Sequence, residues 1–283
     1  KQESICSVSA VVCHAYLRWL LTQGITPTAK ELKIGKDGWL WKEKALHSRR
    51  APGNTCISSL KGMTRFTDER AKNNSKGAGA IMRVAPVACL VRSGDEAAAK
   101  GVFHLGKEIS WITHGHPSGY LSAAAFAVIL HALLWEHSMK IGIQRARTLL
   151  SREDDSDETL AAIEVALTCV EKRVEPEPAI QKIGEAGVGE EALGVAIYCA
   201  LMADDFASGV RMSVNHDGDS DTTGLLVGQV LGAIYGEAAI PAHWLSDLEA
   251  QEIIRRVSDD LGDYFEWNLE DPIEAGRVGE RYP

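Results

Sequence analysis

Apolar residues recur at helical spacing along most of the chain, whereas strand-like alternation of apolar and polar positions is scarce. Residue types that commonly cap helices suggest further helix starts, because Thr26 and Thr28 lead into AKELKIG and Ser151 leads into REDD. The pattern therefore predicts an all-α architecture. The expected helices cover about 7–22, 83–93, 98–112, 119–138, 159–170, 190–206 and 222–236.

Two segments depart from the plain helical pattern. Residues 33–80 are rich in Gly, Lys, Asn and Ser, so we expect loops and short helices there. In 222–236 the glycines recur every fourth residue, at 224, 228, 232 and 236, which aligns them on one face of a helix. Such a face suits close packing of another backbone, so this segment is predicted to be the central helix of the bundle.

Composition narrows the class of protein. The chain has 283 residues, 45% of them hydrophobic, with no internal repeat, so residues 1–283 are expected to form one compact domain. A net charge of -9 argues against general nucleic-acid or anionic-membrane binding, and no apolar run reaches the length of a membrane span. Six cysteines without a Cys-x-x-Cys pair indicate reduced thiols and a cytoplasmic protein.

Three acidic residues, Asp217, Asp219 and Asp221, precede the apolar segment 222–236. One aspartate is explained as a helix N-cap, with Asp221 as the candidate. Crowded carboxylates repel one another by about 1 kcal/mol in water and about 4 kcal/mol at a partly buried site. Together with the Thr222 hydroxyl, Asp219 and Asp221 offer the hard oxygen ligands that suit Mg²⁺, Mn²⁺ or Ca²⁺ rather than zinc. The residues alone leave a metal site and an elaborate helix cap as alternatives.

The motif HDGDSDTTG at 216–224 resembles the C-terminal metal motif of the ADP-ribosylglycohydrolase family. Further blocks resemble that family in the same order along the chain: RAPGNTCISSL at 50–60, GAGAIMRVAPVA at 77–88, THGHP at 113–117 and EEALGVAIYCAL at 190–201. The resemblance implies an all-helical fold that holds two Mg²⁺ or Mn²⁺ ions and hydrolyses the bond between ADP-ribose and an acceptor.

The resemblance also implies roles for individual residues. Asp219, Asp221 and Thr222 would be metal ligands, and His114 would contact ADP-ribose. The segment from Gly77 to Arg83 would meet the ribose and diphosphate, because its glycines let backbone N–H groups approach an anion and a helix start follows. For Arg83, pairing with a diphosphate and pairing with a structural carboxylate both stay open, while His116 is expected to bond to backbone. The implied substrate-binding residues are Gly77, Ala78, Gly79, Ala80, Met82, Arg83 and His114.

One departure from the family pattern affects the functional prediction. The family's upstream Thr-Asp-Asp-Thr metal motif is absent, and the chain begins at Lys1 inside a helical pattern, so we expect the start of the protein to lie elsewhere. No catalytic base is assigned. The main hypothesis is a metal-dependent hydrolase that removes ADP-ribose from a modified protein side chain, with ADP-ribosyl-arginine as the favoured substrate. The alternatives are a catalytically impaired protein that binds ADP-ribose or blocks an ADP-ribosyltransferase, and a helical scaffold without a ligand.

Overall fold

The computed structural model describes residues 7–29, 31–66 and 69–282. In these ranges the chain forms α-helices, 3₁₀-helices and turns, and the β-structure they contain is one isolated antiparallel bridge between Gly77 and Val188. The all-α prediction is confirmed. The chain divides into two compact units, one made of residues 1–68 with 247–283 and the other of residues 69–246. A single domain over 1–283 stays a prediction.

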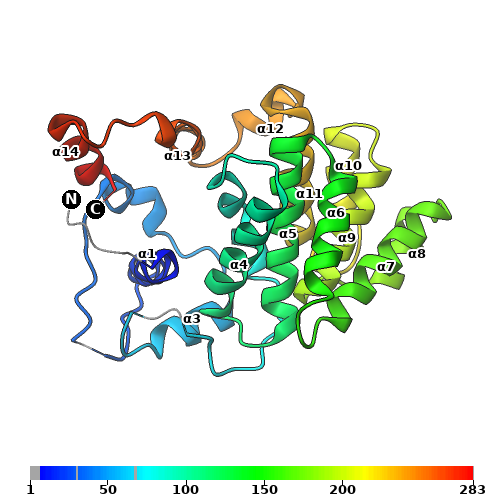
Figure 1. The fold of residues 1–283 in the computed structure, drawn as a ribbon, viewed down its shortest axis with the longest axis horizontal. Helices are drawn as coiled ribbons and strands as arrows, with labels where there is room; N and C mark the ends of the chain where they lie inside the picture. The colour runs from blue at the N-terminus through cyan, green and yellow to red at the C-terminus, as the bar shows by residue number, and fades with distance from the viewer. Residues whose placement is uncertain (1–6, 30, 67–68, 283) are drawn as a thin grey trace. The chain divides into compact units, whose positions relative to one another are not determined.

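The larger unit, 69–246, contains most of the helices (Figure 1). They are η2 (Ile81–Arg83), η3 (Ala85–Cys89), α4 (Glu96–Trp111), α5 (Pro117–Glu136), α6 (Met139–Leu150), α7 (Asp157–Glu171), α8 (Pro176–Ile183), α9 (Gly189–Met202), α10 (Phe206–Val214), α11 (Ser220–Tyr235), η4 (Glu237–Ala239) and α12 (Ala242–Ser246).

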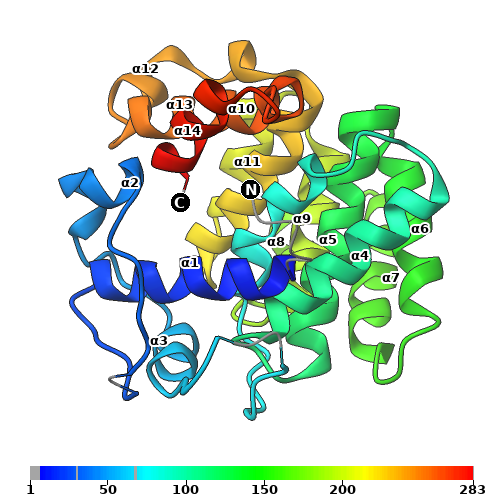
Figure 2. The same cartoon turned by 60° about the vertical axis from the view of Figure 1, so that its left-hand side comes forward.

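Helix α5 forms the centre of the larger unit, with α4 and α6 alongside it in both views (Figures 1 and 2). Every residue from Ser118 to Leu133 is buried, because this helix is apolar on all sides and can be stable only inside a core. By length and composition α5 could also cross a membrane, which corrects the expectation that no apolar run is long enough, but 89% of its most apolar window is buried inside the structure. A core helix of a soluble protein passes the same test, so this is weak evidence for a membrane span.

The smaller unit contains α1 (Val8–Thr22), α2 (Trp39–Lys42), η1 (Lys44–His47), α3 (Asn54–Lys61), α13 (Gln251–Asp263), η5 (Tyr264–Glu266) and α14 (Pro272–Arg281). Its two chain segments are joined by an ion pair between Arg50 and Glu249, and the Arg256 guanidinium lies 4.2 Å from the centre of the Trp39 ring. The expectation of loops and short helices over 33–80 is confirmed, since α2, η1 and α3 are four to eight residues long.

Two expected helix starts are wrong. The Thr28 amide donates to the carbonyl oxygen of Lys61, the last residue of α3, at 2.8 Å, so this segment pairs with the end of that helix and does not begin one itself. Ser151 ends α6, with its hydroxyl bonded to the Thr148 carbonyl oxygen, and the next helix begins six residues later at Asp157. Helix α6 itself was missed, although its buried positions Met139, Ile143, Ala146 and Leu150 follow helical spacing.

The helix expected over 83–93 is also wrong, because the structure has the short 3₁₀-helices η2 and η3 in this region. Pro86 lacks an amide donor and disfavours the α conformation at the residue before it, so an α-helix cannot run through this point.

The interpretation of the glycines in α11 needs correction. A Cβ atom added at Gly228 or Gly232 would meet nothing within 4 Å, and one at Gly224 would meet the Val214 side chain. No backbone packs closely on this face among the described residues. The buried side of α11 is instead the side that carries Leu226 and Val230, and the central helix is α5.

The five described cysteines, Cys13, Cys56, Cys89, Cys169 and Cys199, are free thiols, as expected, and Cys6 lies outside the described residues.

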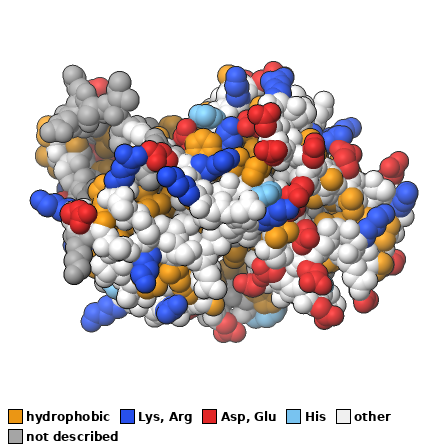
Figure 3. Space-filling model, turned by 90° about the horizontal axis from the view of Figure 1, so that it is seen from below, with side chains coloured by type: hydrophobic (Ala, Val, Ile, Leu, Met, Phe, Trp, Pro, Cys, Tyr) orange, Lys and Arg blue, Asp and Glu red, His pale blue; other side chains and the backbone are white. Residues whose placement is uncertain are grey.

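Figure 3 shows acidic and basic side chains interspersed over one face of the molecule. The absence of a nucleic-acid or membrane partner and a cytoplasmic location stay predictions.

Candidate functional site

Four loops of the larger unit that are far apart in sequence are linked by hydrogen bonds. The Gly189 amide donates to the Lys76 carbonyl oxygen at 2.8 Å, next to the bridge between Gly77 and Val188. The Asp219 amide donates to the Glu185 carbonyl oxygen, also at 2.8 Å. Backbone and side-chain hydrogen bonds bring together four segments, which are 71–83, 113–117, 184–190 and 216–222. All the residues implied by the family resemblance lie in these segments.

The acidic turn, residues 216–222, leads into the first turn of α11. Asp219 occupies the N-cap position, which corrects the assignment of Asp221 to that role, yet no backbone hydrogen bond to the Asp219 side chain meets normal capping geometry. Its carboxylate instead accepts a hydrogen bond of 3.0 Å from the Thr222 hydroxyl. Burial raises the pKa of Asp219, and the adjacent Asp221 carboxylate raises it further. The turn therefore places two mutually repelling carboxylates and a buried hydroxyl side by side.

The oxygen donors of this turn match the ligand preference of hard divalent cations, and a metal site here stays a prediction. Carboxylate and hydroxyl oxygens are the ligands that Mg²⁺ and Mn²⁺ prefer, and a bound cation would relieve the repulsion between Asp219 and Asp221. The described residues contain no group of three or more His, Cys, Asp or Glu side chains arranged to hold a metal. The donors implied for the metal site are the Asp219 and Asp221 carboxylates and the Thr222 hydroxyl.

His216 orders the acidic turn and was not singled out from the sequence. Its Nδ1 accepts a hydrogen bond of 3.0 Å from the Gly218 amide, and its Nε2 lies 3.0 Å from the Thr223 hydroxyl. Gly218 has no room for a side chain, since a Cβ there would lie 2.3 Å from the Glu185 carbonyl oxygen. In the sequence, the spacing of His216 and Gly218, with one residue between them, was the available signal for this turn.

Met82 connects the acidic turn to the segment from Gly77 to Arg83. The Thr222 hydroxyl lies 3.4 Å from the Met82 sulfur, and the Gln229 amide nitrogen donates to the Met82 carbonyl oxygen at 3.2 Å. Ala78 and Ala80 are buried, which fixes the backbone between Gly77 and Met82. This segment continues into η2, which is three residues long, so the expected helix start that would attract an anion is wrong.

Arg83 and His114 meet through Thr113. The Arg83 guanidinium donates to the Gly79 carbonyl oxygen at 3.1 Å and to the Thr113 hydroxyl, and that hydroxyl lies 2.8 Å from Nδ1 of His114. Burial and the nearby Arg83 charge lower the pKa of His114 to about 3, so the ring is neutral at pH 7. Arg83 thus holds its own loop in shape, while contact with a diphosphate stays a prediction.

The other histidine of this motif behaves as expected. His116 is the N-cap of α5, and its Nδ1 accepts a hydrogen bond of 3.1 Å from the Ser118 amide. The ring of His114 lies beside the Gly77–Arg83 segment, because a Cβ added to Gly77 would lie 3.5 Å from His114 Nε2. The structure therefore separates a structural histidine from one beside the implied binding segment.

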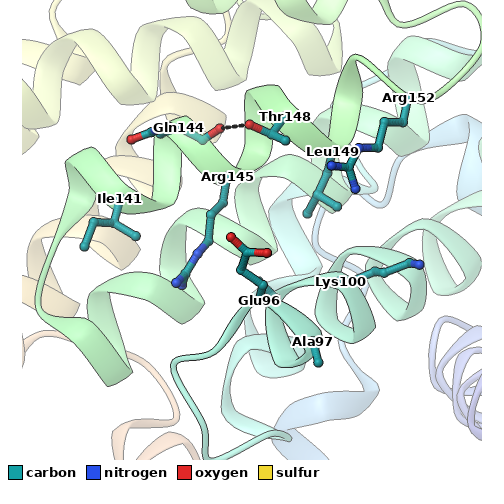
Figure 4. A pocket seen from close by; sticks show the side chains of 10 residues that line it. Glu96, Ala97, Lys100, Ile141, Gln144, Arg145, Thr148, Leu149 and Arg152 are labelled. Atoms are coloured by element: carbon teal, nitrogen blue, oxygen red, sulfur yellow. Dashed lines mark hydrogen bonds between the residues drawn. The ribbon is translucent and has the colours of Figure 1, made fainter.

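A pocket of about 580 Å³ lies elsewhere in the larger unit, between α4 and α6 (Figure 4). Lys100, Arg145, Arg152 and Glu96 contribute the charged side chains of its lining. None of the residues implied by the family resemblance lines this pocket, so it is separate from the candidate site.

Comparison with known proteins identifies the family. The family model described as ADP-ribosylglycohydrolase matches residues 2–270. The chain therefore belongs to the ADP-ribosylglycohydrolase family, a family of ADP-ribosyl hydrolases. A solved structure described as an ADP-ribosylglycohydrolase-related protein complex covers 90% of this chain and 97% of its own, with a TM-score of 0.57 and 19% identity, which supports the fold.

Individual relatives are distant. ADP-ribosyl-[dinitrogen reductase] glycohydrolase of Rhodospirillum rubrum is 27% identical over 216 residues, covering 74% of this chain and 64% of its own. ADP-ribosylhydrolase ARH3 of Bos taurus is 25% identical over 234 residues, covering 72% and 63%. ADP-ribosylarginine hydrolase Tri1 of Serratia proteamaculans is 30% identical over 80 residues, covering 28% and 22%. The chain thus spans less than two thirds of the length of these relatives.

Proposed function

We propose that this chain carries the binding site of a metal-dependent hydrolase that removes ADP-ribose from a modified protein side chain, with ADP-ribosyl-arginine as its substrate. Family membership supports the hydrolase class. Relatives named as an ADP-ribosylarginine hydrolase and as a glycohydrolase of ADP-ribosylated dinitrogen reductase support this substrate class. Because the chain spans less than two thirds of its relatives, the activity of the whole protein is part of the proposal.

One observation carries the proposal: Thr222 contacts both Asp219 and Met82, so the acidic turn and the Gly77–Arg83 segment lie directly against each other. Asp219, Asp221 and Thr222 would hold Mg²⁺ or Mn²⁺ beside this segment. Such a cation supplies positive charge that stabilises negative charge on the substrate oxygens in the transition state. The neighbouring Gly77–Arg83 segment, called the glycine segment, would then receive the ribose and diphosphate of ADP-ribose.

The protein residues of this site have binding roles in the proposal. His114, with its pKa lowered to about 3, stays neutral at pH 7 and can form hydrogen bonds to a ligand without adding charge. The Arg83 guanidinium, fixed by Gly79 and Thr113, contributes a permanent positive charge beside the glycine segment. No described residue is assigned as the general base.

The first experiment measures thermal unfolding with and without Mn²⁺ for the parent chain and for Asp219→Asn, Asp221→Asn and Asp217→Asn. Asp217 is an exposed acid in the same turn and serves as the matched control. A cation present at 100 times its Kd stabilises a folded protein by about 2.7 kcal/mol. We expect this stabilisation in the parent and in Asp217→Asn, and its loss in the other two variants. Equal stabilisation of all four proteins would remove the ligand assignment.

The second experiment incubates the parent chain with an ADP-ribosylated arginine substrate and Mn²⁺, and measures released ADP-ribose by chromatography. Release that disappears in Asp219→Asn supports the hydrolase. Binding of ADP-ribose without release would contradict hydrolysis by this chain and would instead identify a protein that binds ADP-ribose, or that blocks an ADP-ribosyltransferase.

A further inference from the structure

Lys76 precedes Gly77 and connects the glycine segment to two helices. Its ammonium group contacts both carboxylate oxygens of Glu158, at the start of α7, and lies 3.5 Å from Oε1 of Glu190, at the start of α9. Helices α7 and α9 pack against each other (Figure 1). One side chain therefore joins the glycine segment to two packed helices of the larger unit.

The backbone at Lys76 is held at the same place. Its carbonyl oxygen accepts the hydrogen bond from the Gly189 amide, immediately before Glu190. Gly189 has no room for a side chain, because a Cβ there would lie 2.3 Å from the Ser122 hydroxyl oxygen, which shows how closely α5 approaches. The position of the glycine segment thus depends on the first turn of α9.

The two carboxylates around Lys76 differ in burial. The Glu158 side chain is 50% exposed, so its ion pair is screened by water and contributes little to stability. Glu190 is 8% exposed, and Oε2 of its carboxylate has no hydrogen-bond partner among the described atoms. Burial raises the pKa of Glu190, which shows that its negative charge is poorly solvated. Lys76 therefore offsets a buried charge at Glu190, on α9, and a charge already screened by water at Glu158.

We propose that Glu190 is a positioning residue that, through Lys76, fixes the Gly77–Arg83 segment against α9 and so sets the affinity of that segment for its ligand. The inference rests on the proposed function for the identity of the ligand, ADP-ribose. Glu190 itself need not touch the ligand. The dependence is geometric, because Lys76 is bonded to α9 by its side chain and by its carbonyl oxygen.

The test compares Glu190→Gln with the matched variant Glu158→Gln, which makes the same change in the other partner of Lys76. Hydrogen exchange of the amides at residues 75–80 is measured without ligand. We expect exchange about tenfold faster in Glu190→Gln, because the segment opens more often, and less than about threefold faster in Glu158→Gln. Equal exchange in Glu190→Gln and the parent would overturn the inference whether or not the protein binds ADP-ribose.

ADP-ribose affinity, measured by calorimetry with Mn²⁺, gives the second readout. We expect Glu190→Gln and Lys76→Met to weaken binding about tenfold, and Lys76→Arg, which retains the charge, to restore parental affinity. The Lys76 pair keeps the test valid if Glu190→Gln fails to fold. A parent that binds no ADP-ribose but shows the expected exchange difference would contradict the proposed function and support the positioning role. Parental affinity in Lys76→Met would contradict the positioning role.

Discussion

The two halves of the candidate site are built differently. The glycine half, residues 71–83 with 113–117, is held by protein contacts on both sides. The Ala71 amide bonds to the Trp111 carbonyl oxygen, the Asn73 amide group bonds to the Thr113 carbonyl oxygen, and the Gly115 amide bonds to the Asn73 side chain, all at 2.8–3.0 Å. These contacts fix the shape of the glycine half.

The acidic half, residues 216–222, contains both stabilising hydrogen bonds and two carboxylates that repel each other. Its backbone is held at Glu185 and by the His216 ring, but burial and the nearby Asp221 carboxylate both raise the pKa of Asp219. Under the proposed function, the glycine half would be a preformed cradle and the acidic half would be completed by a cation.

The largest expected effect comes from filling the tightest contact in the glycine half. In Gly115→Ala the new Cβ would lie 2.2 Å from the carbonyl oxygens of Ala71 and Asn73, and backbone atoms cannot move aside cheaply. We expect a loss of roughly 3 kcal/mol or more in the free energy of unfolding, measured by urea denaturation. The control is Gly101→Ala in α4, where a Cβ would meet nothing within 4 Å. Equal midpoints for the two variants would show that the loop is not rigid.

Periodicity predicted the buried helices well and the loops between them poorly. The segments at 98–112, 119–138 and 222–236 were correct within a few residues, because long apolar runs leave a clear helical pattern. The helix over 83–93 failed because Pro86 overrides a favourable pattern of apolar residues. The glycines of α11 show that an aligned face need not be a packed face.

The residue types of the candidate site were visible in the sequence, but their arrangement was not. The contact between Thr222 and Met82 spans 140 residues, and no local pattern encodes such a pairing. Lys76 and Glu190 were missed for the same reason, since each looks like an ordinary charged residue until the fold brings them to 3.5 Å. The roles assigned to Asp219, Asp221 and Thr222 stay predictions.

An intermediate effect is expected from acidifying the glycine half. Because the pKa of folded His114 is lowered to about 3 from its ordinary value of 6.5, the folded state binds fewer protons than the unfolded state between these values. The contribution of His114 to the free energy of unfolding is fully present above pH 6.5 and is lost as the pH falls toward 3. Between pH 7 and pH 4.5 the expected loss is roughly 2 kcal/mol, measured by urea denaturation at both pH values.

The control for this prediction is His114→Asn, which offers an amide oxygen near the position of Nδ1 and does not titrate. We expect its stability to change less than that of the parent over the same pH interval, with the difference equal to the His114 contribution. A parent and variant with the same pH dependence would show that the His114 ring is accessible to protons in the folded protein.

The smallest effect is expected in α11, behind the acidic half. Gly228 lies in the helix interior, and a Cβ there would meet nothing within 4 Å. Gly228→Ala should therefore stabilise the protein by about 0.5–1 kcal/mol, since alanine loses less backbone entropy on folding, and the stabilisation by Mn²⁺ should not change. The comparison variant is Gly224→Ala, whose Cβ would lie 2.6 Å from a Val214 side-chain carbon and should gain less. A lower urea midpoint for Gly228→Ala would mean that another part of the protein packs on this face, so that the support of the acidic half extends beyond α11.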